Sequence, residues 1–322
     1  MTCTTAQTGF AEAFSLWHTL LERKEWSTVF LTPEWQETWW AQCGVGGSDL
    51  RLLKVGADDE PLGIAPMALQ GETLAFLGDT DLFDYHDFIG ESPEFFEALV
   101  RCLDAEPWSE LDLRSVPEFS PTLTHLVDLY RVKGYSVSVE PEDVVPGLQL
   151  PATWDEYLAG LRKKDRHELR RKLRRLESAG EVRVVLSDES SLDKDVDAFL
   201  ELMRESSDEK RDFMRPDREA FFRRVVQRIH EAGHLRLFSL DLDGERVASV
   251  ICFDYDGRRL LYNSGYRLAH RPLSVGLMLK ALCLKDAIES GMSYFDFLRG
   301  PEPYKYHLGG KDVTLYHVLV GR

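Results

Sequence analysis

The spacing of hydrophobic positions changes several times along the chain and predicts alternating helices and strands. In the first half, apolar residues recur at helical spacing over 8–23, 32–43, 93–104 and 119–132. Shorter runs with the character of strands cover 50–55, 62–69, 73–78, 110–114 and 135–139. Residues 141–151 hold three prolines and show little period, so we expect a link between two lobes there.

The second half repeats this alternation. Helices are predicted over 153–159, 163–179, 191–206, 217–232 and 273–290. Strands are predicted over 181–186, 235–241, 246–254, 258–266, 293–298 and 312–320. Asp243-Gly244 is a strong hairpin-turn signal between two of these strands. The helix over 273–290 is apolar on almost every side, so we expect it to be buried.

Both halves contain the same order of elements: helices, a three-stranded meander, a helix and a strand. Leu50-Arg51-Leu52 and Leu235-Arg236-Leu237 lie 185 positions apart, and Asp112 and Asp296 lie 184 apart. A length of 322 residues also favours two domains. We therefore predict a duplicated α/β (α+β) fold with lobes 1–145 and 146–322, each a mixed sheet flanked by helices.

Composition narrows the class of protein. No run of about 18 apolar residues occurs, so no membrane span is expected. The first residues lack the features of a signal peptide, which makes a cytoplasmic location the default expectation. The five cysteines and nine histidines show no metal-ligand spacing, so no metal is expected. The oligomeric state is not predicted.

One segment departs from the acidic character of the chain. The whole chain carries a net charge of −16, but residues 162–176 hold nine Lys and Arg against two acids, a net of +7. Leucines at helical spacing predict that this helix docks by one face and exposes a cationic face. An anionic partner is expected: donor phosphates, an anionic acceptor or tRNA. The alternative is pairing with acidic surfaces of the same protein or of a second copy.

The turn Arg271-Pro272-Leu273-Ser274-Val275-Gly276 joins the last meander strand to the apolar helix. Such a turn presents backbone N–H groups at a helix N-terminus, where the helix dipole attracts phosphate. Arg271 and Gly276 resemble the Q/R-x-x-G-x-G/A signature of the GNAT acetyltransferases, and Ser274 stands where the first glycine is usual. A serine N–H can still point at phosphate and its hydroxyl can cap the helix. An ordinary serine-capped helix is the alternative.

A wider resemblance surrounds this turn. Residues 262–310, and most specifically FDFLRGPEPYK over Phe295–Lys305, look like the GNAT subfamily named for cellulose-biosynthesis-associated acetyltransferases. Its relatives are the peptidoglycan Fem aminoacyltransferases. Segments 162–177 and Phe30–Trp35 also match, so the resemblance covers nearly the whole chain. It implies two GNAT-like lobes with the donor site in the second.

The first lobe lacks an equivalent of the donor turn. Its meander is followed by Gly78–Asp87, GDTDLFDYHD, whose four aspartates would repel a pyrophosphate. We therefore expect that the first lobe has lost donor binding. Within this loop, Asp84 and Tyr85 are expected to face the acceptor and hold a cationic amine, and a plain acidic loop is the alternative.

The resemblance and the turn together nominate site residues. The donor, acetyl-CoA or another acyl-CoA, is expected to contact Tyr266, Arg271, Leu273, Ser274, Val275 and Gly276. Asp296 is a candidate base for the acceptor amine, or else a structural carboxylate paired with Arg299 or a backbone group. Tyr304 is a candidate acid for the leaving thiolate, or else a packed aromatic residue. Arg299 and Lys305 are expected to bind a phosphate or a substrate carboxylate, or else are solvated loop charges.

The leading functional hypothesis is an N-acyltransferase that moves an acetyl or other acyl group, not an aminoacyl group, from acyl-CoA to a primary amine. The expected acceptor is an amine of a small molecule or of a peptide. Fem-like aminoacyl transfer from tRNA, bound by the basic helix 162–176, is a second hypothesis. A binding module that has lost its chemistry is a third, motivated by the departure at Ser274. The acceptor itself is not predicted.

Overall fold

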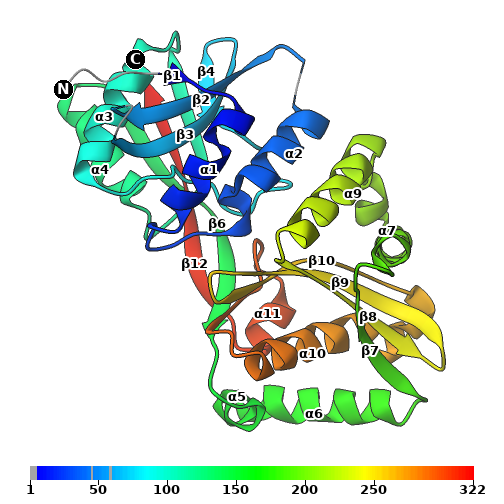
Figure 1. Cartoon of the computed structure of the whole chain (residues 1–322). Coiled ribbons are helices and arrows are strands. Elements are labelled where there is room, and N and C mark those ends of the chain that lie inside the picture. Colours follow the sequence, from blue (N-terminus) through cyan, green and yellow to red (C-terminus); the bar gives the residue numbers. More distant parts are fainter. Residues whose placement is uncertain (1–5, 45, 58–59) are drawn as a thin grey trace. The chain divides into compact units, whose positions relative to one another are not determined.

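A computed structural model of the chain describes residues 6–44, 46–57 and 60–322 (Figure 1). The chain forms two compact units. The first contains Met1–Val144 and the last strand, Val313–Arg322, and the second contains Val145–Asp312. The sequence placed the last strand in the second lobe, but its apolar residues are buried in the first unit.

The first unit is a mixed sheet covered by helices. Its strands are β1 (Ala6–Gln7), β2 (Ser48–Gly56), β3 (Pro61–Gln70), β4 (Thr73–Phe76), β5 (Glu110–Pro117), β6 (Ser136–Gln149) and β12 (Lys311–Gly321). They lie in the order β1-β2-β3-β4-β5-β12-β6, and β4 and β5 are parallel. Its helices are α1 (Phe10–Leu21), α2 (Pro33–Cys43), α3 (Pro93–Ala105) and α4 (His125–Val132).

The second unit continues from the end of β6. Its further strands are β7 (Val182–Leu186), β8 (Leu235–Leu242), β9 (Glu245–Tyr255), β10 (Arg258–Tyr266) and β11 (Tyr294–Asp296), in the order β6-β11-β10-β9-β8-β7. Its longer helices are α5 (Trp154–Gly160), α6 (Lys163–Glu177), α7 (Leu192–Ser206), α9 (Pro216–Glu231) and α10 (Val275–Glu289). Within this unit, α10 and then α6 lie on one face of the sheet, and α7 and α9 lie on the other (Figure 1).

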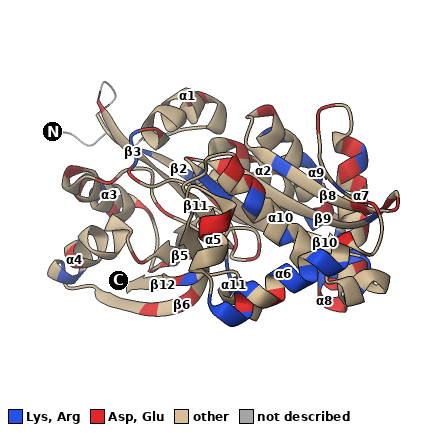
Figure 2. Ribbon diagram, turned by 90° about the horizontal axis from the view of Figure 1, so that it is seen from below, with Lys and Arg blue, Asp and Glu red and all other residues tan. Residues whose placement is uncertain are grey.

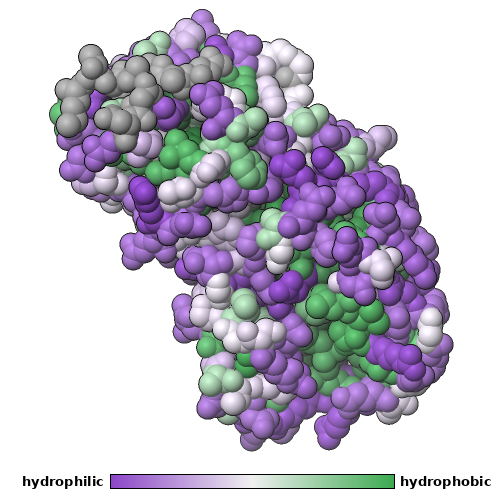
Figure 3. All heavy atoms as spheres, viewed as in Figure 1, coloured by the Kyte–Doolittle hydropathy of each residue, from purple (hydrophilic) through white to green (hydrophobic). Residues whose placement is uncertain are grey.

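Local sequence explains the main elements of the second unit. The turn between β8 and β9 has left-handed backbone at Asp243 (φ 51°) and Gly244 (φ 83°), which is the geometry of a tight hairpin and confirms the predicted turn. Helix α10 buries most of its residues in a core shared with β8, β9 and β10, as its apolar composition predicts. Apolar side chains also gather on the visible face over the strands of this unit (Figure 3).

The predicted mixed α/β fold is confirmed, and the differences are local. Residues 141–151 are mainly strand, because β6 runs on to Gln149 and its end pairs with β11. The boundary between the two units, between Val144 and Val145, falls inside the predicted link, but the segment is strand and not irregular. A proline lacks an N–H but keeps a carbonyl, and the Pro146 carbonyl accepts from Phe297 N at 2.9 Å. Two short helices were not predicted, α8 (Asp208–Phe213) and α11 (Pro303–His307).

The two units share an order of elements. In the first it is β2, β3, β4, α3 and β5, and in the second it is β8, β9, β10, α10 and β11. In each, the last strand is parallel to the third strand of the meander. Asp112 faces Ala75 across the first parallel pair, and Asp296 faces Leu260 across the second, at the same third register position. This correspondence supports the predicted duplication.

Candidate donor site in the second unit

Two parallel strands of the second unit pair over a short stretch only. β10 and β11 are in register from Arg258 to Leu260, and β11 ends at Asp296. β10 continues to Tyr266 beside β9, with a bulge between Leu261 and Asn263. In the described chain, the edge of β10 after the bulge therefore has no strand partner on the β11 side. On this stretch the Ser264 carbonyl accepts from Lys210 and the Ser264 N–H donates to Asn263 Oδ1 at 2.8 Å, and the rest of the edge offers backbone groups to an extended ligand.

The chain then turns into α10 and leaves donors open at its first turn. The first backbone hydrogen bond of the helix runs from Met278 N to Ser274 O, at 2.9 Å. Among the described residues, no backbone or side-chain group accepts from the N–H groups of Val275, Gly276 and Leu277. Three unpaired N–H groups at the positive end of a 15-residue helix favour phosphate, and Leu277 is the most exposed of the three residues, since Val275 and Gly276 are buried.

Ser274 takes part in this turn differently from the expectation. Its N–H donates to Arg271 O at 2.9 Å, so this N–H does not point at a ligand. Its hydroxyl makes no capping hydrogen bond. Its backbone is left-handed (φ 59°, ψ 35°), a conformation that glycine adopts without strain, and this explains why glycine is usual at the position.

The other predicted donor residues surround the open N–H groups. Gly276 lies under the ring of Tyr266: a Cβ at this position would be 3.0 Å from Tyr266 Cδ1. Leu273 is half-buried against the core, and Val275 is fully buried. Arg271 is exposed, and in the described part of the chain its guanidinium makes no hydrogen bond or ion pair. The structure thus brings the predicted residues together around one helix start.

The basic helix α6 lies beside the same turn. The guanidinium of Arg175 donates to the carbonyl of Pro272 in the short helix η3 (Leu268–Leu273). Figure 2 shows Lys and Arg concentrated along α6. The exposed cations without an acidic partner in the described structure are Lys163, Lys164, Arg170 and Arg174. The cationic face of this helix and the donor turn are therefore neighbours.

Cationic side chains also lie near the gap between β10 and β11, the space that opens where the two strands stop pairing after Leu260 and Asp296. Lys210, from α8, donates to the carbonyl of Ser264 and, at 3.2 Å, to Asn263 Oδ1 on the free stretch of β10. Lys280, from α10, has its ammonium nitrogen 5.0 Å from the centre of the Tyr304 ring. Burial lowers the pKa of Lys210 to about 8. Burial, together with the positive charge of Lys210, lowers the pKa of Lys280 to about 7.

Tyr304 faces this group from α11. Its half-buried ring packs near Phe297 (centroids 6.3 Å apart), just after β11. Burial raises the pKa of the Tyr304 hydroxyl well above its ordinary value, which makes it a weaker proton donor. Tyr304 therefore contributes a ring surface to the gap, and its role as an acid for a thiolate is not favoured by its environment.

Asp296 has a structural contact where a catalytic one was expected. Its side chain is buried, and its Oδ1 accepts from the backbone N–H of Leu298 at 2.8 Å. Leu298 has left-handed backbone (φ 59°), so the carboxylate stabilises a strained bend directly after β11. This geometry corresponds to the structural alternative for Asp296.

Lys305 is likewise committed to the protein. It is 1% exposed, and its ammonium donates to the carbonyls of Leu298 (2.8 Å), Arg299 (2.6 Å) and Gly300 (2.9 Å). Glu302 lies 2.8 Å from the same nitrogen. With three N–H groups and four acceptors, Lys305 has no donor left for a phosphate or a carboxylate. It positions the loop 298–300, and the half-buried Arg299 lies on that loop.

The first unit differs at the equivalent helix start. Helix α3 begins with Pro93, which has no N–H, and the hydroxyl of Ser92 accepts from Phe95 N at 3.1 Å. Glu94 adds negative charge in the first turn. This helix start is closed to phosphate, in contrast to that of α10.

Tyr85 is buried against Trp26 (centroids 5.0 Å apart), so it belongs to an aromatic core, and Asp84 is half-buried beside it.

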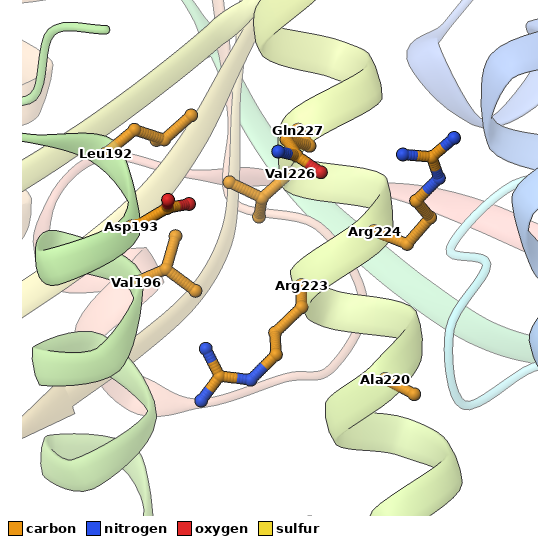
Figure 4. Close-up of a pocket in the computed structure, with 8 residues that line it drawn as sticks. All are labelled: Leu192, Asp193, Val196, Ala220, Arg223, Arg224, Val226 and Gln227. Atoms are coloured by element: carbon orange, nitrogen blue, oxygen red, sulfur yellow. The ribbon is translucent and has the colours of Figure 1, made fainter. Parts of the chain in front are cut away.

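Two cavities lie elsewhere. One, of about 330 Å³, lies between α7 and α9. In Figure 4, Arg223 reaches toward α7 and Arg224 points away from it. Arg223 is already paired with Asp197 (2.7 Å) and Glu219 (2.8 Å), so its charge is balanced within the protein. The other, of about 310 Å³, lies in the first unit beside the divergence of β4 and β5.

Sequence reasoning missed Lys210 and Lys280. Lys280 is a cation at the centre of an otherwise apolar stretch, VGLMLKALCL, and this isolation was a usable signal. Lys210 lies in DEKRDF, a charged segment with nothing to distinguish it. Its proximity to β10 depends on the short helix α8, which the pattern did not predict.

The comparisons with known proteins agree with this geometry. Residues 163–306 match the sequence profile described as an acetyltransferase (GNAT) domain. This segment lies within the second unit and contains the donor turn, α10 and β11. Over these residues the second unit is therefore similar to a GNAT acetyltransferase domain. No curated protein matches the chain by sequence.

Solved structures share the fold over nearly the whole chain. A crystal structure of FemX aligns with a TM-score of 0.68 at 14% identity, covering 98% of this chain and 96% of that one. The C-terminal domain of a putative lysylphosphatidylglycerol synthetase from Agrobacterium fabrum aligns at 0.62 and 11%, covering 98% and 93%. A tandem GNAT protein from the clavulanic acid biosynthesis pathway aligns at 0.51 and 13%, covering 98% and 97%. At these identities the likeness is one of fold.

The described residues contain no cluster of three or more His, Cys, Asp or Glu side chains suited to a metal ion. None of their helices combines the length and the apolar run that crossing a bilayer requires.

Proposed function

We propose that the chain is an N-acyltransferase that transfers an acyl group from acyl-CoA to a primary amine at the second unit. The observation that carries the proposal is the free edge of β10, which leads directly to the three open N–H groups of Val275, Gly276 and Leu277. A pyrophosphate fits the helix start, and the extended arm of the donor fits the strand edge. The thioester would then lie in the gap between β10 and β11.

The predicted donor residues receive distinct roles in this proposal. Arg271, exposed and unpaired in the described structure, would add a charged contact to the phosphates. Gly276 and Tyr266 would form the surface over which the extended arm of the donor passes. Gly276 has no side chain to block this surface, and it lies against the Tyr266 ring. The first unit would bind no donor, because Ser92 and Pro93 close its equivalent helix.

Two substitutions at Ser274 that differ in charge but hardly in shape test where the donor phosphates bind. Aspartate and asparagine both tolerate left-handed backbone, and aspartate at a helix start interacts favourably with the dipole. Ser274→Asp should therefore keep the fold but weaken acetyl-CoA binding by about tenfold or more, because its carboxylate lies beside the phosphates. Ser274→Asn, of the same shape, should bind within about twofold of wild type.

Isothermal titration with acetyl-CoA measures both variants, and their melting temperatures check the fold. Equal affinity of the aspartate and asparagine variants would contradict placement of the phosphates at α10. Absence of acetyl-CoA binding by wild type at about 1 mM, the upper range of ordinary KM values, would overturn the acyl-CoA proposal as a whole.

A second candidate function uses aminoacyl-tRNA as the donor. The observation that favours it is the contact between Arg175 and Pro272, which places the cationic face of α6 beside the donor turn. FemX and the lysylphosphatidylglycerol synthetase domain share this fold, and the Fem proteins are aminoacyltransferases. In this proposal the RNA backbone would follow α6 and the aminoacyl end would enter the gap.

The tRNA candidate predicts binding that is sensitive to salt and depends on α6. Arg170→Glu combined with Arg174→Glu should reduce tRNA affinity by more than about tenfold and flatten its dependence on salt concentration. Both side chains are exposed and unpaired in the described structure, so the fold should persist. Arg131→Glu with Arg211→Glu makes the same change of charge outside α6 and serves as the control. Equal effects of the two pairs on tRNA affinity would exclude α6 as the RNA site.

A further inference from the structure

Transfer of an acyl group to an amine requires a proton acceptor near the thioester, and the expected carboxylate, Asp296, is already engaged by the backbone. Asp296 is buried and bound to Leu298 N, so its carboxylate points into the bend after β11. Glu302 is paired with Lys305 at 2.8 Å. The groups that do line the gap are basic: Lys210 and Lys280.

Lys280 is placed differently from the other lysines of the gap. It lies one helical turn after Gly276, so both are on the same face of α10. Lys210 has the Ser264 carbonyl and Asn263 as acceptors, and Lys305 has three carbonyls and Glu302. Within the described chain, Lys280 makes no hydrogen bond or ion pair, and its one polar contact is with the Tyr304 ring. Its nitrogen is therefore open to a ligand.

We propose that Lys280 is the proton-transfer residue of the acyltransferase: it takes the proton from the acceptor amine and returns it to the leaving sulfur. The proposal rests on the acyltransferase function proposed above. It requires a lysine that is neutral near pH 7, free of acceptors, and adjacent to both the amine and the thioester. Lys280 has the first two properties, and its place one turn after Gly276 on the same face of α10, with the Tyr304 ring 5.0 Å from its nitrogen, supports the third.

The environment of Lys280 favours its neutral form. Burial is the main cause, and the positive charges of Lys210 and Lys305 add to it, while Glu302 and Cys283 oppose it. These groups come from the elements packed around the amine: α8, α11, the loop before α11, and α10 itself. Together they lower the pKa of Lys280 to about 7, so a large fraction of the amine is unprotonated at neutral pH.

Lys280 can carry the proton through the whole acyl-transfer step. The neutral amine nitrogen attacks the thioester carbonyl carbon, forming a C–N bond, and the proton on that nitrogen passes to Lys280 Nζ. The C–S bond then breaks, and the sulfur takes the same proton from Lys280. An ammonium with a pKa of about 7 is a stronger acid than an ordinary thiol at about 8.5, so this return is favourable. The products are an amide and a thiol, and Lys280 is neutral again.

The first experiment measures the amine itself and does not require turnover. Wild-type protein is labelled with trace acetic anhydride across about pH 6 to 10, and each lysine is quantified by mass spectrometry. Lys280 should become reactive with a midpoint near 7. Lys285, on the same helix, with a side chain 40% exposed and paired with Glu289, is the internal control, and Lys280 should be labelled in preference to it at about pH 7. A midpoint for Lys280 that matches that of Lys285 would overturn the proposal.

The second experiment separates proton transfer from donor binding. Lys280→Arg keeps a cation that cannot lose its proton, and Lys280→Met keeps the length of the side chain without an amine. Both should bind acetyl-CoA within about threefold of wild type but transfer acetyl groups to ethanolamine, glycine or lysine about 10²–10⁴-fold more slowly. The wild-type rate should rise with pH through about 7, and this limb should disappear in both variants.

The outcomes distinguish the two levels of the proposal. If wild type does not bind acetyl-CoA, the acyl-CoA function fails, whatever the labelling of Lys280 shows. If wild type binds and transfers but Lys280→Arg retains more than about a tenth of the rate, Lys280 is not the proton acceptor. Lys285→Met, which changes the same residue type on the same helix, should leave both binding and transfer unchanged.

Discussion

At the scale of single residues, the loop after β11 depends on one buried ammonium. Lys305 satisfies the carbonyls of Leu298, Arg299 and Gly300 at 2.6–2.9 Å while only 1% exposed. Lys305→Met would leave three carbonyl acceptors, one buried and two partly buried, without this donor, at a cost of about 3 kcal/mol in the free energy of unfolding. Urea denaturation should show this loss. Lys311→Met, at an exposed position, should change stability by less than about 0.5 kcal/mol, and a similar loss in both variants would contradict the role given to Lys305.

Lys280 also makes a residue-scale prediction about stability and pH. Folding lowers its pKa from 10.5 to about 7, so the unfolded chain binds more protons between these values and stability rises with pH across that window. Below about pH 7 the amine is charged in both states and the unfavourable burial is fully expressed. Lys280→Met should therefore stabilise the protein most at about pH 6, and the gain should shrink toward about pH 10. Thermal melts of both proteins across this range would test it, and a gain independent of pH would contradict it.

Single residues differ in how far the sequence could predict them. The start of α10 was predictable, because an arginine, a glycine and a helix onset occur within six positions, and these groups are neighbours through local structure alone. Lys305 and Asp296 were assigned to ligands from their chemistry, but each binds backbone groups close by in sequence. Residue type does not distinguish a carbonyl of the chain from a ligand oxygen. Only the fold of residues 296–305 decides between them.

At the scale of elements, helix α6 stabilises the donor turn as well as presenting charge. Arg175 reaches the Pro272 carbonyl from α6, whereas Arg174, its neighbour in sequence, is exposed and unpaired in the described structure. Arg175→Met should loosen η3 and weaken acetyl-CoA binding by about three- to tenfold, the effect of losing one charged hydrogen bond. Arg174→Met removes the same charge from the same helix and should change affinity by less than about twofold. Titrations of the two variants test whether contact or net charge is responsible, and equal effects would favour charge.

Elements were predictable where one periodicity dominates, and they were missed where two signals compete. Helices α6 and α10 and the hairpin of β8 and β9 follow directly from apolar spacing and turn chemistry. In β6, prolines interrupt the alternation, and the strand persists because neighbouring strands supply its partners. Helices α8 and α11 have six and five residues, too short for a helical period to emerge.

At the scale of the whole molecule, the same order of elements has two different chemical outcomes. In both units a three-stranded meander is followed by a helix and then by a strand that is parallel to the third strand of the meander. In the second unit the helix starts with three open N–H groups, and in the first it starts with a proline and a capping serine. Since fold alone does not determine function, this difference at two helix starts supports one donor site per chain.

The connectivity of the two units leads to a prediction about their independence. β12 ends the chain but pairs with β5, and its Leu315, Val318 and Val320 are fully buried in the first unit. Deleting Val313–Arg322 removes three core side chains, each worth about 2–5 kcal/mol, and exposes the edge of β5. The sum is comparable to the whole stability of a typical domain, about 5–15 kcal/mol, so the first unit should lose its protection.

The second unit should respond differently to the same deletion. The donor turn, α10 and the β10 edge lie within Val145–Asp312, and their core is formed by residues of that segment. Hydrogen exchange should therefore become fast in β4 and β5 and stay slow in β9 and α10, and acetyl-CoA should still bind within about threefold. Deleting Arg322 alone is the milder control. It removes the cation–π contact with the Trp108 ring (4.1 Å) and hydrogen bonds to the carbonyls of Asp104, Leu103 and Ser109, about 2–4 kcal/mol in total, and should leave both units protected. Loss of protection in α10 after the larger deletion would show that the donor site requires a folded first unit, and the site would then belong to the whole molecule.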